Sequence, residues 1–324
     1  MKRTLSLILL AACSLLPMGA QAPMDGGVWN DNTGKHINAH GGSIFNYKGT
    51  YYWYGESRSA DGKPYSSLGV SCFTSKNLKD WTNHGLVLPV SSEPGSDIEG
   101  GCIIERPKVL YNARTKKFVM WFHLEMKGKG YAAARSGVAV SDTPFGPFRF
   151  VRSGRVNAGR YPIGFALADT TDLRQKLTEP EYKGWWTPQW YTQIERGMFF
   201  MRDFQGGQMA RDMTVFVDDD GKAYHIFSSE DNLTLNIAQL TDDYMEHNGS
   251  FVRVAAGGLN EAPTIFKQDG TYWMITSGCT GWDPNAARLF RAKNIFGPWE
   301  KLPNPCRGNG ADKTFGGQGT YIYK

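Results

Sequence analysis

An internal repeat of four similar units is the feature that most constrains the fold of this chain. Each unit begins with a short apolar strand, turns tightly, and continues into a strand rich in aromatic residues. The first strands of the units are Gly42–Phe45, Arg106–Tyr111, Asp212–Phe216 and Ala262–Phe266. Because such a unit exposes apolar faces on both sides, it is stable only between neighbours. The repeat therefore predicts the blades of an all-β propeller.

The ring also needs a closing unit, and only the first strand of that unit, Thr320–Tyr323, is evident. We therefore expect a five-bladed β-propeller whose last blade is incomplete at the C-terminus. The composition agrees with an all-β fold, because 38 Gly, 15 Tyr and 18 Phe among 324 residues favour short strands and turns over long helices.

The N-terminal 22 residues have the pattern of a secretory signal peptide: the basic pair Lys2-Arg3, the apolar run Leu5–Leu16 and the cleavage site Ala20–Ala22. The apolar run is shorter than the roughly 20 residues of a spanning helix, so we expect no transmembrane segment. Processing as a lipoprotein at Cys13 is an alternative, which the apolar residues after Cys13 disfavour. The sequence thus predicts a secreted or periplasmic protein whose residues 23–324 form one catalytic domain.

Net charge bears on which partners the protein can bind, and cysteine content bears on which disulfides it can form. The formal charge of +5 falls to +3 when Lys2 and Arg3 leave with the signal peptide, and no long Lys/Arg run follows. We therefore expect no nucleic-acid partner. Four cysteines remain, and an oxidising compartment permits disulfides among them. We expect Cys279 to pair with Cys306, since both lie in loop-like segments flanking one hairpin, although three pairings are open.

One segment, residues 151–211, interrupts the repeat and brings four large aromatic residues close together, namely Trp185, Trp186, Trp190 and Tyr191. One interpretation is an insertion that covers the flank of the propeller by ordinary hydrophobic packing. The other is a sugar subsite, because pyranose rings present apolar C–H faces that stack on aromatic rings. The sequence leaves both open.

The starts of the repeats are the candidate functional positions, because the innermost strand of each propeller blade begins near the central channel. The residues there are His40, Glu105, Asp212, Glu261 and Gln318, with Arg106 and Arg211 beside two of the acids. Three carboxyls from three blades suit glycoside cleavage, in which a carboxylic acid protonates the leaving oxygen. A neighbouring like charge raises the pKa of that acid and keeps it protonated. We therefore predict a glycosidase site in the channel.

Three motifs resemble those of glycoside hydrolase family 43, namely Asp212–Phe216, Asp218–Tyr224 and Asn260–Pro263. The resemblance implies a five-bladed propeller, an inverting reaction, and three acids that act as base, pKa modulator and acid. By motif, Glu261 corresponds to the general acid and Asp212 to the pKa modulator. The family's usual aspartate base is absent, because the first unit opens with His40 and two glycines instead.

In lacking this aspartate, and in its segments Glu105–Val109 and Ser277–Trp282, the chain resembles the subgroup of exo-β-1,3-galactanases. This resemblance implies release of galactose from β-1,3-galactan, the backbone of arabinogalactan, with Gln318 in the place of the base and Glu105 as a further active-site residue. A neutral amide is a poor base, so Gln318, Glu105 and His40 all stay open for that role. The residues expected to bind substrate are His40, Arg106, Arg211, Trp185, Trp186, Trp190 and Trp282.

Two other functions remain open from the sequence. An α-L-arabinofuranosidase of the same family has nearly the same motifs, and a catalytically impaired glycan-binding propeller would explain the missing aspartate. We expect no required cofactor. Many family members hold a calcium ion in the central channel, and Gln318 takes about the place of the histidine that assists it, so a central calcium stays open but nothing in the sequence supports it.

Overall fold

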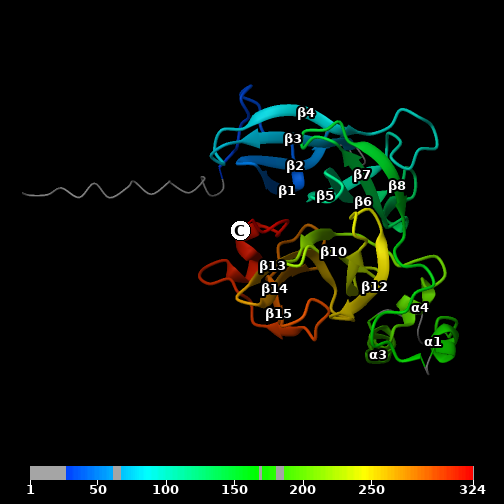
Figure 1. Cartoon of the computed structure of the whole chain (residues 1–324). Coiled ribbons are helices and arrows are strands. Elements are labelled where there is room, and N and C mark those ends of the chain that lie inside the picture. Colours follow the sequence, from blue (N-terminus) through cyan, green and yellow to red (C-terminus); the bar gives the residue numbers. More distant parts are fainter. Residues whose placement is uncertain (1–26, 61–66, 168–169, 180–185, 324) are drawn as a thin grey trace, which may run out of the picture.

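The computed structural model describes residues 27–60, 67–167, 170–179 and 186–323, and within these ranges its strands form four antiparallel sheets of four strands each (Figure 1). The first blade contains β1 (His40–Tyr47), β2 (Thr50–Arg58), β3 (Ser67–Ser75) and β4 (Thr82–Pro89). The second contains β5 (Ile103–Asn112), β6 (Lys117–Glu125), β7 (Arg135–Ser141) and β8 (Arg149–Gly154). The third contains β9 (Met213–Val217), β10 (Ala223–Ser229), β11 (Thr234–Leu240) and β12 (His247–Val254). The fourth contains β13 (Asn260–Gln268), β14 (Thr271–Gly278), β15 (Arg288–Ala292) and β16 (Glu300–Leu302).

The blades are arranged around a common centre, with the first strand of each blade innermost. Strand β1 packs beside β5, β5 beside β9, and β9 beside β13. Apolar clusters fill the spaces between neighbouring blades. They include Tyr54 and Met120 between the first and second blades, Val119 and Val215 between the second and third, and Ile226 and Met274 between the third and fourth. The prediction of an all-β propeller built from the repeats is confirmed.

The expected fifth blade is wrong for the described residues, because Thr320–Tyr323 pairs with no strand. This segment instead runs between the first and fourth blades (Figure 1). The Thr320 hydroxyl donates to the Gly42 carbonyl at 3.0 Å, and the Tyr323 ring lies edge-on to Tyr51. Three glycines between Gly316 and Gly319 weaken strand formation, so side-chain contacts close the ring here.

The segment that interrupts the repeat follows β8 and contains α1 (Thr170–Lys176), α3 (Pro188–Arg196) and α4 (Met198–Arg202). Helix α3 begins after Thr187, whose hydroxyl accepts the Trp190 N–H at 3.1 Å, and ends at Gly197 in the left-handed region. The helices pack against the apolar cluster that joins the second and third blades, where Trp190 is fully buried. No helix in the described ranges is long and apolar enough to cross a membrane.

Two positions of the first blade have no room for a side chain, because backbone lies too close to them. A Cβ atom on Gly55 of β2 would lie 2.3 Å from the backbone carbonyl of Ala39, directly before β1. A Cβ atom on Gly42 would lie 1.9 Å from the Tyr54 carbonyl oxygen. Because β1 carries His40 into the centre, these two glycines fix the approach of the chain to that position.

We expect Gly55→Ala to lower the free energy of unfolding by about 1–3 kcal/mol, because the added methyl group has to displace backbone. The matched control is Gly154→Ala, whose Cβ atom meets nothing within 4 Å. The control is expected to change stability by less than about 0.5 kcal/mol. Urea denaturation measures both, and equal midpoints for the two variants would contradict the steric account.

Candidate active site

A cavity of about 670 Å³ opens at the centre of the ring, where the inner strands of the blades and residues 316–320 meet. It brings together eight residues that the sequence singled out: His40, Glu105, Arg106, Arg211, Asp212, Glu261, Trp282 and Gln318. Further lining residues that were not predicted as site residues include His123, Tyr131 and Asn232, and also Ser277, which the sequence analysis named only as the start of a motif.

A shared backbone irregularity aims three of these side chains into the cavity. Strands β1, β5 and β13 are each interrupted by a bulge, which follows His40, Glu105 and Glu261 respectively. The next residue in each strand has a positive φ: Gly41 (57°), Arg106 (51°) and Ala262 (50°). A bulge bends its strand and redirects a side chain, so the repeat places equivalent residues of three blades at one point.

Lys108 supports two of these bulges from behind. Its side chain is fully buried, and its ammonium group donates to the carbonyls of Gly41 at 3.0 Å and Arg106 at 3.2 Å. Burial, followed by the charge of Arg106, lowers the pKa of Lys108 well below its ordinary value, while Asp212 opposes that shift. The lysine thus joins the inner strands of the first and second blades.

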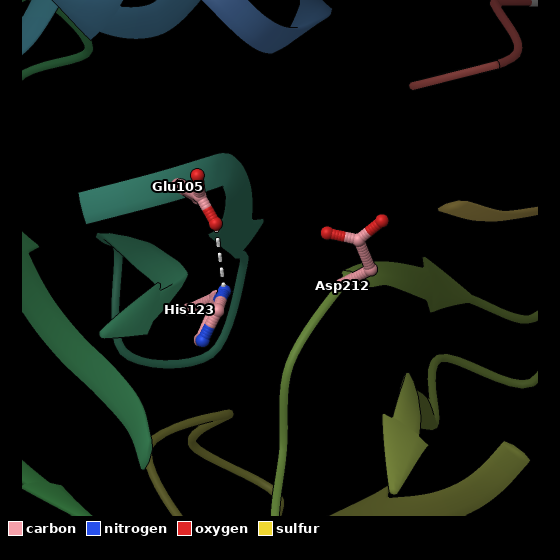
Figure 2. Close-up of side chains that lie close together, drawn as sticks. All are labelled: Glu105, His123 and Asp212. Carbon is pink, nitrogen blue, oxygen red and sulfur yellow. Dashed lines mark ion pairs between the residues drawn. The ribbon is translucent and has the colours of Figure 1, made fainter. Parts of the chain in front are cut away.

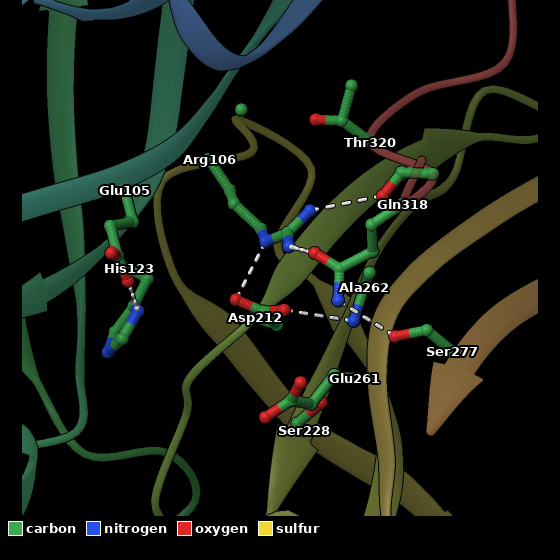
Figure 3. Close-up of polar contacts among 12 residues, drawn as sticks. Glu105, Arg106, His123, Asp212, Ser228, Glu261, Ala262, Ser277, Gln318 and Thr320 are labelled. Atoms are coloured by element: carbon green, nitrogen blue, oxygen red, sulfur yellow. Dashed lines mark hydrogen bonds and ion pairs between the residues drawn. The ribbon is translucent and has the colours of Figure 1, made fainter. Parts of the chain in front are cut away.

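Arg106 connects three parts of the site (Figure 3). Its Nε lies 2.7 Å from Asp212 Oδ1, and its two terminal nitrogens donate to Gln318 Oε1 at 2.5 Å and to the Gly319 carbonyl at 3.2 Å. The Gln318 amide in turn donates to Ser277 Oγ at 2.8 Å. The other oxygen of Asp212 accepts the Ala262 N–H at 3.0 Å. Each polar group of Gln318 therefore has a partner, which fixes the plane of the amide.

Glu261 has the surroundings of a protonated carboxylic acid. Burial, and next the charge of Asp212, raises the pKa of Glu261 above its ordinary value. Asn232 donates to Glu261 Oε1 at 2.8 Å, and this contact only partly opposes the shift. A carboxyl whose pKa is raised in this way stays protonated at higher pH and can donate its proton.

Glu105 has the opposite surroundings (Figure 2). His123 Nδ1 lies 3.1 Å from Glu105 Oε2, the Tyr131 hydroxyl donates to Oε1 at 3.2 Å, and Arg58 lies 3.4 Å from Oε1. Burial opposes ionisation of Glu105, but His123, Arg106 and Arg58 together bring its pKa to about 2. Glu105 is therefore an ionised acceptor over the whole neutral range.

The remaining predicted binding residues differ in placement. Trp282 is 89% exposed at the mouth of the cavity, and Arg211 donates to the Tyr131 carbonyl at 3.0 Å on the wall. Trp190 is buried in the core and Trp186 packs on it, and neither lines the cavity. Their packing matches the interpretation of the insertion as a cover. Trp185 lies outside the described residues.

The expected disulfide between Cys279 and Cys306 is wrong, because the four cysteines in the described ranges are free. Cys279 instead interacts with Glu261. Burial and the neighbouring Glu261 raise the pKa of the Cys279 thiol to about 12, so it remains protonated.

Glu105, His123 and Asp212 each offer one donor atom within 4.8 Å of the others, the spacing of a metal site (Figure 2). This cluster already contains its own cations. Glu105 and Glu125 raise the pKa of His123 to about 9 against the effect of burial, and Arg106 neutralises Asp212. Calcium prefers 6–8 oxygen ligands, so the residues present do not fit a calcium site.

Comparison with known proteins agrees with this chemistry. The model of glycosyl hydrolases family 43 matches residues 177–319. Among solved structures, the family 43 β-1,3-galactosidase BT3683, with galactodeoxynojirimycin, is 59% identical with a TM-score of 0.86, and the match covers 92% of this chain and 85% of that one. No curated protein matches the chain.

Two longer proteins are similar over the same 92% of this chain, which spans 52% and 54% of their lengths. They are the β-1,3-galactosidase BT0265, 36% identical with a TM-score of 0.74, and an exo-β-1,3-galactanase from Clostridium thermocellum, 36% identical with a TM-score of 0.71.

A propeller that gathers carboxyl groups from three blades in one cavity, one with a raised pKa and one ionised, has the arrangement of a glycosidase, and the similar family 43 structures show that this chain is one. The 59% sequence identity to BT3683 over nearly the whole chain then defines its family. The chain belongs to glycosyl hydrolase family 43.

Proposed function

We propose that this protein is an exo-acting β-1,3-galactosidase that releases galactose from β-1,3-galactan with inversion at the anomeric carbon. The observation that carries the proposal is the pairing of Glu261, whose pKa is raised, with the ionised Glu105 in a single cavity. The substrate assignment is supported by the similar solved structures, which are β-1,3-galactosidases and an exo-β-1,3-galactanase.

The acid half of the reaction is assigned to Glu261. Its proton passes to the leaving glycosidic oxygen while the bond between that oxygen and the anomeric carbon breaks. Asp212 keeps the proton on Glu261 beforehand, because a second negative charge nearby disfavours ionisation of the acid. The position of Asp212 is fixed by Arg106 on one oxygen and by the Ala262 N–H on the other.

The water half requires a group that accepts a proton as the water oxygen bonds to the anomeric carbon. Gln318 holds its amide between Arg106 and Ser277, which suits orientation of the water but supplies little basicity. The side chain of His40 is 54% exposed, and its Nδ1 lies 3.4 Å from Glu56. Glu105 is ionised and partly buried, so we assign it the role of accepting the proton of the water. We assign Gln318 the role of orienting that water.

Glu261→Gln is expected to lower kcat/KM for β-1,3-galactan by about 10²–10⁴-fold, because the amide has no proton to give to the leaving oxygen. Chromatography of the released sugar measures the rate, and NMR of the first product is expected to show the α-anomer. The control is Glu300→Gln, which removes an exposed carboxylate paired with Arg291.

Equal galactose release by Glu261→Gln and the control would refute the acid assignment. Release of arabinose in place of galactose would favour an α-L-arabinofuranosidase. Sugar binding without turnover by the unaltered protein would favour a glycan-binding propeller.

Glu105→Gln is expected to lower kcat by about 10²–10⁴-fold. Added azide is expected to restore turnover in this variant by attacking the anomeric carbon without a base, giving an α-galactosyl azide. Gln318→Ala is expected to lose activity that azide does not restore. The opposite result, rescue of Gln318→Ala alone, would assign the base to Gln318.

We also propose that the protein is exported after cleavage behind Ala22, on the grounds of its basic and apolar N-terminal sequence. Expression of the full chain in a bacterium with a Sec pathway is expected to give a periplasmic or secreted protein. Its intact mass should correspond to a first residue of Pro23. A lipid-modified Cys13 at the N-terminus would show lipoprotein processing instead.

A further inference from the structure

Behind Glu105 lies a buried histidine that contacts a carboxylate on each side. His123 and Glu125 are alternate residues of β6, so their side chains point to the same face of the sheet. His123 is directly opposite Glu105 of β5 in the strand register. The side chain of His123 is 1% exposed and that of Glu125 is 0% exposed, and Glu125 is not part of the cavity wall.

The two carboxylates that contact this histidine favour a proton on both ring nitrogens. Nε2 lies 2.9 Å from Glu125 Oε1, and Nδ1 lies 3.1 Å from Glu105 Oε2. A neutral imidazole has one N–H, so it would turn a lone pair toward one of the two carboxylates. The Nδ1 contact lacks the alignment of a good hydrogen bond, which makes the charge its main contribution.

The acidic groups that face His123 favour the imidazolium, while the nearby cations Arg58 and Arg106 are paired with Glu105 and Asp212. The acidic groups are Glu105 on β5, Glu125 on β6 and Asp212, which has a carboxylate oxygen within 4.8 Å of the ring. The Tyr131 ring lies 6.1 Å away and its hydroxyl donates to Glu105. Glu125 is held in place by its second oxygen, which accepts the Ala134 N–H at 2.9 Å.

We propose that His123 and Glu125 are positioning residues that act through Glu105: a permanent imidazolium, fixed by Glu125, keeps Glu105 ionised and in one orientation inside the cavity. The proposal rests on the proposed function in that Glu105 serves the galactosidase reaction as an acceptor. It adds that the low-pH limit of the reaction is set by a residue pair behind Glu105 that does not touch the reacting atoms.

Glu125→Gln tests the charge while keeping the contacts. The amide oxygen takes the Ala134 N–H, and the amide nitrogen donates to His123 Nε2, which is then unprotonated. Nδ1 keeps its N–H toward Glu105, but the ring is neutral. Buried Glu105 then loses its nearest cation, and the acid limb of kcat/KM is expected to move to higher pH by about one unit or more.

The matched control is Asp218→Asn, since Asp218 is 9% exposed, is paired with Lys267 at 2.6 Å, and lies outside the cavity. It is expected to leave the acid limb within about 0.3 units of the unaltered protein. Circular dichroism over the same pH range establishes that each variant is folded where its activity is measured. An unmoved acid limb in folded Glu125→Gln would overturn the proposal.

If Glu125→Gln fails to fold, His123→Gln removes the same charge and is expected to give the same shift. Acting through Glu105 also has a signature: in a Glu105→Gln background, adding Glu125→Gln is expected to leave the pH profile unchanged. A further shift in the double variant would show that the pair acts by another route.

A measurement without turnover separates this proposal from the proposed function. The ¹⁵N shifts of the His123 ring, assigned with His123→Gln, are expected to show imidazolium at about pH 7 and a neutral ring in Glu125→Gln. A neutral ring in the unaltered protein would overturn the proposal even if galactose is released. Absence of galactose release with an imidazolium would refute only the proposed function.

Discussion

The balance of buried charge at the centre of the ring is the constraint on which the rest of the structure depends. Three blades each direct a carboxylate to this point, and like charges in a partly dry cavity repel one another. The second blade supplies most of the compensation, with Arg106 against Asp212 and the His123 ring against Glu105, and the first blade adds Arg58 beside Glu105. Because Arg106 also binds Gln318 and the Gly319 carbonyl, the side chain that balances the charge also anchors the segment that closes the ring.

The cations are shared unequally, and this asymmetry gives chemically similar side chains different roles. Glu105 has three cationic neighbours and a pKa of about 2. Glu261 has one of these cations, Arg106, together with an amide, a thiol and a second carboxylate nearby, and its pKa is raised. Two carboxyls whose surroundings separate their pKa values are the arrangement that acid and base catalysis at one pH requires. The division follows from where the cations lie, on the first and second blades beside Glu105, since the backbone presents Glu105 and Glu261 in the same way.

Much of this arrangement was predictable because the repeat encodes it. The aromatic hairpins predicted the blades, and the repeat starts predicted which residues reach the centre. His123 and Glu125 were missed because they lie at the end of the largely apolar strand Lys117–Glu125. The sequence of that strand alone does not show that their side chains point toward the centre of the ring. The signal that could have found them is the hairpin register, because pairing β5 with β6 places His123 opposite Glu105. Glu125, two residues later, then lies on the same face of the sheet. The fifth blade and the disulfide were wrong because both depend on how residues 303–323 pack, and that segment has glycines and contacts distant in sequence.

The bulges explain how one repeat supports a site that is not symmetric. In three blades the residue after the bulge start has a positive φ, which glycine tolerates and other residues adopt at a cost. The first blade has Gly41 there and the fourth has Ala262, whose N–H binds Asp212. Only the second blade, among these three, places a long cationic side chain at that position, and Lys108 holds the carbonyl of the same residue. The strain at Arg106 is therefore offset by the lysine two residues later. In this way a repeated backbone distortion delivers acids from two blades, Glu105 and Glu261, but a guanidinium from one, and that guanidinium lies against Asp212.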